Sequence, residues 1–384
     1  MNSIKPFNLD IRTDEIDNLK IRLNNARWPE PETVDDGTQG LSTSYLRKFC
    51  GYWANGYDWY TIQKRINDLD NYTITIDSLN FHFIHVRSSY PEAKPLLLTH
   101  GWPGSIIEFL KILEPLAEPQ KHGGMIEEAC HLICPTLPGF GFSEKPKRTG
   151  WGVERIARAW DTLMAELGYH EYFAQGGDWG AGVTTALGSL KDGKCRSIHV
   201  NMPTSGPTQK ALRDPSESDR KALEKGKRFS SQGLGYHKVQ STRPQTIGYL
   251  LADSPIGQAA WILEKFWEWT DCAGHPENIF TRDELIDNVM FYWLTNCGAS
   301  SARIYWETFN PNQKIKPQPV LIPSAISLFP KENMVGPRSW SEQRYKNIIY
   351  WNELDKGGHF AAFEQPDLFV KEITKWLRLF DSKT

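Results

Sequence analysis

The sequence lacks an apolar run of the roughly 20 residues that a helix needs to cross a bilayer. It also lacks an excess of charge, because 44 Lys and Arg residues are balanced by 46 Asp and Glu residues. Binding of nucleic acid through a basic surface is therefore not expected. The N-terminus, MNSIKPFNLDIRTDEIDNLK, is too polar for a signal peptide. We expect a soluble, cytoplasmic protein that does not bind membranes.

Cysteine is scarce, with 6 residues among 384 and no C-x-x-C pair. Cys130 and Cys134 lie in the apolar run ACHLICP, where burial as small hydrophobic residues is the simpler interpretation. No disulfide framework is expected, which agrees with a reducing compartment. The 10 histidines show no metal-ligand spacing. We expect neither a metal nor another cofactor. Aromatic residues, in contrast, are plentiful, and they either fill a core or line an apolar pocket.

For the first 70 residues, the sequence pattern predicts helices and loops and no strands. In DEIDNLKIRLNNARW, Ile16, Leu19 and Leu23 recur at helical spacing. A second, aromatic helix is predicted in YLRKFCGYWANGYDWYTIQKRINDL. The period then changes to two on both sides of Asp77-Ser78, which predicts a hairpin.

Strands and helices alternate from Pro95 onward. Short apolar runs predict strands in PLLLTHG, HLICP, YFAQ, SIHVNMP, PVLIPSA (319–325) and NIIYW. Helices are predicted in GVERIARAWDTLMAELGY, from Ala181 onward, and in the C-terminal QPDLFVKEITKWLRLF, where Pro366 lies in the first turn. This order is typical of an α/β protein with a mostly parallel, doubly wound sheet.

Residues 204–312 interrupt the alternation with a polar loop, SESDRKALEKGK, and two aromatic helical stretches, IGQAAWILEKFWEWT and ELIDNVMFYWLTNCGASSARIYW. About 110 mainly helical residues are too many for a crossover between two strands. We therefore predict an N-terminal domain over residues 1–92, a core over 93–203 and 313–384, and an inserted helical cap over 204–312.

The motif GGDWG places Asp178 between a predicted strand and a helix, with glycines at 176, 177 and 180. It has the form of the G-x-S-x-G turn, which lifts a nucleophile above the sheet. An ordinary aspartate that caps the following helix is the alternative. Short motifs of this kind arise often by chance, so the surrounding motifs decide between the two.

Two other loops are predicted at the carboxyl ends of strands. In THGWPGS, a sharp turn would aim the N–H of Trp102 into the site beside the N–H of Trp179, and the bond from Trp102 to Pro103 can be cis. In KGGHF, His359 is placed to act as a base. The other histidines are interpreted as packed or solvated residues.

A catalytic histidine needs a carboxylate that holds its tautomer and stabilises its cation. Asp355, Glu353 and Glu332 are the candidates near His359. We favour Glu332, which follows a predicted strand, because Asp355 is too close in sequence and Glu353 belongs to the strand exit. The chain order is then nucleophile, acid and base, as in α/β hydrolases.

An aspartate nucleophile suits attack on an sp³ carbon with a leaving group, because the product is an alkyl ester that an activated water can hydrolyse. Epoxides and alkyl halides are the two substrate classes that fit. An epoxide oxygen becomes an alkoxide and needs a proton donor, whereas a halide needs only N–H donors.

Together, HGWPGS, GGDWGA, FPKE and GGHFAAFEQP resemble epoxide hydrolases of the α/β-hydrolase superfamily, in the microsomal-type branch. The resemblance covers nearly the whole chain, including the N-terminal LKIRLNNARWPEP. It implies an α/β-hydrolase core with a helical cap, and two cap tyrosines that donate to the epoxide oxygen. The matching segments here carry Tyr236 and Tyr305. The membrane anchor of microsomal members has no counterpart, so membrane attachment is not carried over.

We therefore expect hydrolysis of a small apolar epoxide to a vicinal diol. Asp178 would open the ring, Tyr236 and Tyr305 would protonate its oxygen, and water activated by His359 would cleave the ester. The alternatives are a haloalkane dehalogenase that binds halide through Trp179, and a ligand-binding receptor that has lost turnover. The oligomeric state is left open, a homodimer included.

Overall fold

The computed structural model describes residues 3–309 and 318–382. The strands are β1 (Lys5–Pro6), β2 (Asn71–Ile76), β3 (Leu79–Val86), β4 (Lys94–Thr99), β5 (Cys130–Pro135), β6 (Tyr172–Gly176), β7 (Cys195–Val200), β8 (Ser324–Leu328) and β9 (Ile348–Glu353). Within the described residues they form one sheet in the order β1-β2-β3-β5-β4-β6-β7-β8-β9. The six strands from β5 to β9 in this order pair in parallel, and β1, β2 and β3 form an antiparallel edge.

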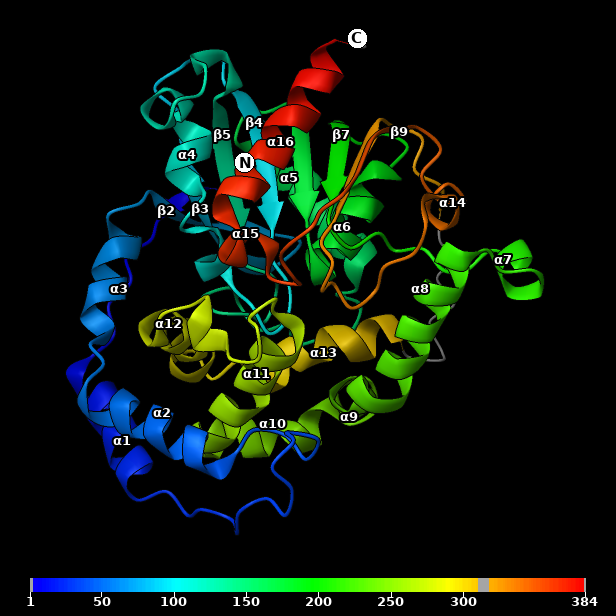
Figure 1. Cartoon of the computed structure of the whole chain (residues 1–384). Helices are drawn as coiled ribbons and strands as arrows, with labels where there is room; N and C mark the ends of the chain where they lie inside the picture. Colours follow the sequence, from blue (N-terminus) through cyan, green and yellow to red (C-terminus); the bar gives the residue numbers. More distant parts are fainter. Residues whose placement is uncertain (1–2, 310–317, 383–384) are drawn as a thin grey trace.

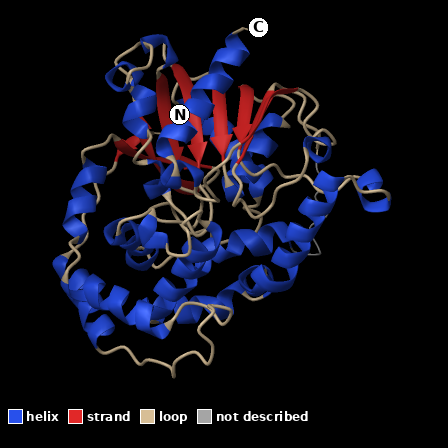
Figure 2. Ribbon diagram, viewed as in Figure 1, coloured by secondary structure: helices blue, strands red, loops and turns tan. Residues whose placement is uncertain are grey.

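Helices cover both faces of the sheet (Figure 2). The core helices are α4 (Leu113–Ala117), α5 (Val153–Glu166), α6 (Asp178–Gly188), α14 (Arg338–Ser341), α15 (Ala361–Glu364) and α16 (Pro366–Asp381). From β4 to β5 the chain moves toward the β1 edge of the sheet, and from β5 to β6 and β7 it moves toward the β9 edge. Right-handed crossovers therefore place α4 on one face and α5 and α6 on the other. The predicted doubly wound α/β architecture is confirmed.

A second group of helices is inserted between β7 and β8. Its members are α7 (Gln209–Arg213), α8 (Glu217–Arg228), α9 (Gly235–Thr242), α10 (Pro244–Asp253), α11 (Pro255–Trp269), α12 (Arg282–Leu294) and α13 (Gly298–Phe309). Figure 1 shows α9 to α13 gathered beyond the carboxyl ends of the strands. Ligands of such sheets bind at this edge, so the inserted helices cover the place where a site is expected. The boundary predicted between residues 312 and 313 lies outside the described residues.

The N-terminal helices α1 (Thr13–Asn24), α2 (Thr43–Asn55) and α3 (Trp59–Asn67) form an arc around the inserted helices (Figure 1). The Tyr52 hydroxyl donates to Asp283 Oδ1 at 2.7 Å, and the Tyr57 hydroxyl donates to Asp287 Oδ1 at 2.6 Å. Both carboxylates belong to α12. The N-terminal segment thus fixes α12 through two side-chain hydrogen bonds.

Several local predictions are confirmed. Ile16, Leu19 and Leu23 are the buried residues of α1. Asp77 and Ser78 both have positive φ angles, 53° and 62°, as expected of a two-residue hairpin turn between β2 and β3. All six cysteines are free and buried. Separately from these predictions, no helix among the described residues combines the length and the apolar character needed to span a membrane.

Two predictions in the N-terminal part are wrong. The second aromatic helix is in fact two helices, because α2 ends at Asn55 and the side chain of Asp58 accepts from the N–H of Tyr60 to start α3. The first 70 residues also contain a strand, β1, which pairs with β2 over Lys5 and Pro6. A two-residue strand leaves no periodic pattern in the sequence.

Three predictions further along the chain also need correction. The polar stretch SESDRKALEKGK is helix α8, whose start is stabilised by a capping box between Ser216 and Asp219. The strand predicted at 319–325 is β8, Ser324–Leu328, since Pro319 and Pro323 lack the N–H groups that a strand needs. Finally, α6 begins at Asp178 rather than at Ala181.

Candidate active site

Asp178 lies at the sharp turn from β6 to α6, with a positive φ angle of 49°. Such a conformation is strained for a residue other than glycine, and strain of this kind is concentrated at functional sites. The turn brings backbones very close, because a Cβ atom on Gly180 would lie 1.8 Å from the carbonyl oxygen of Thr99. The alternative role as a helix cap does not apply. Gly177 occupies the N-cap position, and Asp178 is the first helical residue.

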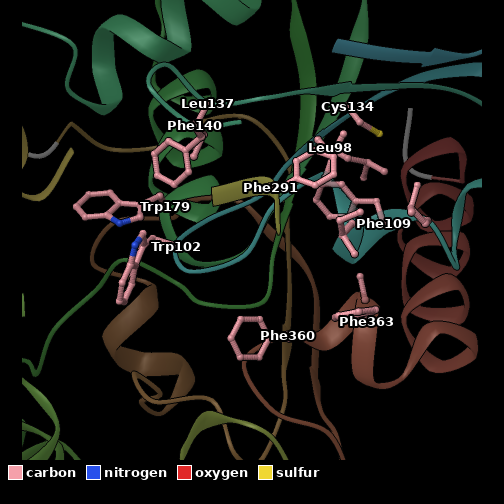
Figure 3. Packing of buried hydrophobic residues seen from close by; sticks show 14 of the residues in the cluster. Leu98, Trp102, Phe109, Cys134, Leu137, Phe140, Trp179, Phe291, Phe360 and Phe363 are labelled. Carbon is pink, nitrogen blue, oxygen red and sulfur yellow. The ribbon is translucent and has the colours of Figure 1, made fainter. Parts of the chain in front are cut away.

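The carboxylate of Asp178 is held by the loop that follows β4. The N–H of Trp102 donates to Asp178 Oδ1 at 2.7 Å, and the bond between Trp102 and Pro103 is cis. The described structure records no hydrogen bond from the Trp179 N–H to this carboxylate. Figure 3 shows the indoles of Trp102 and Trp179 next to each other at one end of the buried cluster, and both contact the ring of Tyr305.

His359 lies between two carboxylates. Its Nε2 atom is 3.3 Å from Asp178 Oδ2, and its Nδ1 atom is 2.8 Å from Glu332 Oε1. Glu332 is fully buried in the loop after β8, and its Oε1 atom also accepts from the N–H of Asn333. The structure thus brings together Asp178, His359 and Glu332. Asp355 and Glu353, the alternatives weighed for the acid, are exposed.

The two carboxylates control the charge of His359. Burial alone would lower the pKa of the imidazole, but the negative charges and hydrogen bonds of Glu332 and Asp178 outweigh it and raise the pKa well above its usual value. His359 is therefore an imidazolium at neutral pH as long as Asp178 carries its negative charge. Loss of the Asp178 charge would remove part of that stabilisation and lower the pKa again.

The inserted helices hold the loop of His359 in place. The N–H of His359 donates to the carbonyl oxygen of Trp269 at 3.0 Å, and the two rings meet edge to face with centroids 4.8 Å apart. The N–H of Gly357 donates to Asp271 Oδ2, and the N–H of Asp271 donates to Glu364 Oε2. The end of α11 therefore positions the base, a role that sequence reasoning did not assign.

Tyr236 and Tyr305 come from α9 and α13 and are both buried beside the Trp102 loop. The ring of Tyr236 stacks on Trp102 at 5.0 Å with an interplanar angle of 7°, and Tyr305 meets Trp179 edge to face at 4.7 Å. Burial and the nearby charge of Asp178 raise the pKa of both phenols, so both hydroxyls keep their protons at neutral pH.

Sequence reasoning missed a further acidic residue at this site. Glu108 borders the same cavity as Asp178 and His359. Its burial raises the pKa of its carboxyl to about 8. The sequence does contain a feature that could indicate a role for Glu108. It is the charged residue in the apolar run SIIEFL, which directly follows the HGWPG motif. Charged residues in such a run are rare unless they have a partner or a function.

The sequence and structure of this chain are similar to those of known proteins. Residues 4–109 match the model of the epoxide hydrolase N terminus, and residues 94–236 match the α/β hydrolase fold. The chain is 49% identical over 380 residues to a protein of Stigmatella aurantiaca that is provisionally named an epoxide hydrolase, with 99% of this chain and 86% of the relative covered.

Two further relatives agree. The chain is 34% identical to Epoxide hydrolase 1 of Sus scrofa, over 99% of this chain and 90% of that protein. The crystal structure of juvenile hormone epoxide hydrolase from the silkworm Bombyx mori superposes with a TM-score of 0.91 at 31% identity, covering 100% of this chain and 96% of the other. The chain therefore belongs to the epoxide hydrolase family and has the α/β-hydrolase fold.

Proposed function

We propose that this protein adds water to an epoxide through a covalent ester on Asp178, giving a vicinal diol. The observation that carries the proposal is that the two oxygens of the Asp178 carboxylate have different partners. Oδ1 accepts from the N–H of Trp102, while Oδ2 faces His359, which is paired with Glu332. One oxygen is thus held where negative charge would develop, and the other is available to attack.

In the first step, Asp178 Oδ2 attacks an epoxide carbon and the C–O bond of the ring breaks. The released oxygen takes a proton from Tyr236 or Tyr305, whose neutral hydroxyls are close enough to Asp178 for its charge to raise their pKa. The product is an alkyl ester with a hydroxyl on the neighbouring carbon. Ester formation removes the charge of Asp178, so the pKa of His359 falls, and its proton returns to the tyrosine.

In the second step, neutral His359 takes a proton from water while the hydroxide attacks Cγ of Asp178. The tetrahedral oxyanion is stabilised by the N–H of Trp102, with the N–H of Trp179 as the second predicted donor. Collapse expels the product alkoxide, which takes the remaining proton of the attacking water. Asp178 is again a carboxylate and His359 an imidazolium, so the cycle closes without net gain or loss of protons.

The surroundings of the site favour apolar substrates. The walls near the two tyrosines consist of the aromatic rings of Trp102, Trp179 and Trp269. Aromatic walls of this kind bind apolar groups, with the tyrosine hydroxyls as polar anchors for the epoxide oxygen. The domain limits of residues 1–92, 93–203 with 313–384, and 204–312 are retained as part of the proposal, with the cap 204–312 as the substrate-covering unit.

Turnover of a small substrate panel tests the proposed reaction. We expect diol formation from styrene oxide and from a terminal alkyl epoxide, measured by chromatography, and no halide release from 1-chlorobutane. A haloalkane dehalogenase would use the same aspartate and could bind halide through an indole N–H such as that of Trp179. Halide release without diol formation would therefore replace the proposal with that alternative, and tight binding without any turnover would favour a receptor.

A further inference from the structure

A small cavity lies behind the Asp178 carboxylate, on the side of the core. Asp178, His359, Glu108, Thr99 and Gln175 are among the residues that line it. Among the described residues its lining includes none of the cap, and so neither Tyr236 nor Tyr305, the proposed proton donors to the substrate. The volume available to the centre of a water molecule is about 20 Å³. That is room for one or two waters and too little for an epoxide.

The cavity is polar enough to hold water. The buried atoms Thr99 Oγ1 and Gln175 Oε1 have no hydrogen-bond partner within the described part of the chain. Buried polar atoms without partners are costly, and a buried water usually satisfies two to four of them. His359 and Asp178, the two residues between which a hydrolytic water must act, border the same space.

We infer that the side chain of Glu108 positions the water that hydrolyses the ester on Asp178. This inference rests on the proposed function. Most of the surface of Glu108 is buried, and the residue borders the cavity. Its carboxyl reaches the loop after β4, where a Cβ atom on Gly104 would lie only 1.4 Å from Glu108 Oε1. Glu108 and His359 thus both border the space that would hold the water.

The segment that carries Glu108 is fixed by the cap. Ser105 Oγ donates to Asn288 Oδ1 at 2.8 Å, and Asn288 Nδ2 donates to the carbonyl oxygen of Pro103 at 2.8 Å. The Tyr292 hydroxyl donates to the carbonyl oxygen of Gly104 at 2.7 Å. Because Asn288 and Tyr292 both belong to α12, the short helix Ile106–Phe109 is held in one position relative to Asp178.

The charge state of Glu108 suits this role. Burial and the charge of Asp178 raise the pKa of the carboxyl to about 8, although the imidazolium of His359 opposes the shift. Glu108 is therefore mostly protonated at neutral pH, and a carboxylic acid both donates and accepts hydrogen bonds. Glutamine has the same shape and can also donate and accept hydrogen bonds. Methionine fills the same space but lacks these hydrogen-bonding groups.

The test measures ring opening and ester hydrolysis separately, with styrene oxide, rapid chemical quench and intact mass. Glu108→Met should slow hydrolysis by roughly 10- to 100-fold, as expected when a reacting group is misplaced, and leave ring opening within about twofold. The alkyl-enzyme should then accumulate. Glu108→Gln should keep most of the hydrolysis rate. Glu114→Met, the same change at an exposed residue of α4, serves as the control.

A second variant moves the carboxyl without removing it. Gly104→Ala introduces a methyl group at the place that Glu108 Oε1 occupies, in a backbone conformation that alanine tolerates. It should slow hydrolysis in the same way as Glu108→Met. Unchanged hydrolysis in both variants, or equal losses in both steps, would overturn the inference. His359→Gln distinguishes failure of the Glu108 inference from failure of the proposed function. Absence of any adduct in that variant would contradict the proposed function itself.

Discussion

Replacing His359 with Gln should leave ring opening possible and almost stop hydrolysis of the ester. General base catalysis contributes roughly 10²- to 10⁴-fold, and glutamine cannot take a proton from water. Glutamine still fills the space beside Asp178 Oδ2, so the nucleophile remains in place. After incubation with styrene oxide, the intact mass of the variant should increase by the mass of one substrate molecule.

His122→Gln is the matched control, because His122 is exposed and pairs with Glu114 on the surface. It should turn over substrate at the wild-type rate and carry no adduct. A folded His359→Gln variant that completes many turnovers would show that His359 is not the base. A folded variant with neither turnover nor adduct would show that His359 is needed before ring opening, which the proposed sequence of steps does not allow.

Replacing both Tyr236 and Tyr305 with Phe should nearly abolish ring opening. One positioned donor to a developing oxyanion is worth roughly 10²- to 10³-fold in rate, and the two hydroxyls can partly replace each other. Each single variant should therefore lose less than the double variant. Rapid-quench measurement of ester formation detects the defect in the first step, while hydrolysis of any ester that forms should remain fast.

Tyr249→Phe removes a hydroxyl from an exposed residue of α10 and should leave both steps unchanged. The double variant also tests packing, because the rings of Tyr236 and Tyr305 contact Trp102 and Trp179. Phenylalanine keeps those contacts, so the thermal midpoint should change little. Normal ring opening in a stable double variant would remove both tyrosines from the mechanism.

The sequence predicts most of what is local and periodic. The alternation of strands and helices predicts the parallel sheet, and the three loop motifs predict which residues meet at its carboxyl edge. The distance of 2.8 Å between His359 and Glu332 agrees with the choice of Glu332, which follows a predicted strand, over Asp355, which is too close to His359 in sequence. That choice was available because parallel strands end at the same edge of the sheet.

Features that depend on three-dimensional packing were not predictable. Glu108 belongs to an apolar run, and only the fold places its carboxyl beside Gly104 and the cavity. Trp269 holds the loop of His359 from an element about 90 residues away in sequence. The start of β8 was misplaced because an apolar run interrupted by Pro319 and Pro323 has the composition of a strand without its hydrogen-bonding capacity.

The central claim is that Asp178 forms a covalent ester, and a single turnover in ¹⁸O-water tests it most directly. With enzyme in excess over styrene oxide, the oxygen added to the substrate comes from the carboxylate of Asp178. Water restores that carboxylate by attacking Cγ. The diol should therefore contain mostly unlabelled oxygen, and the label should appear in the peptide that contains Asp178. Labelled diol from the first turnover, with an unlabelled protein, would contradict the covalent mechanism and make Asp178 at most a base for direct attack by water.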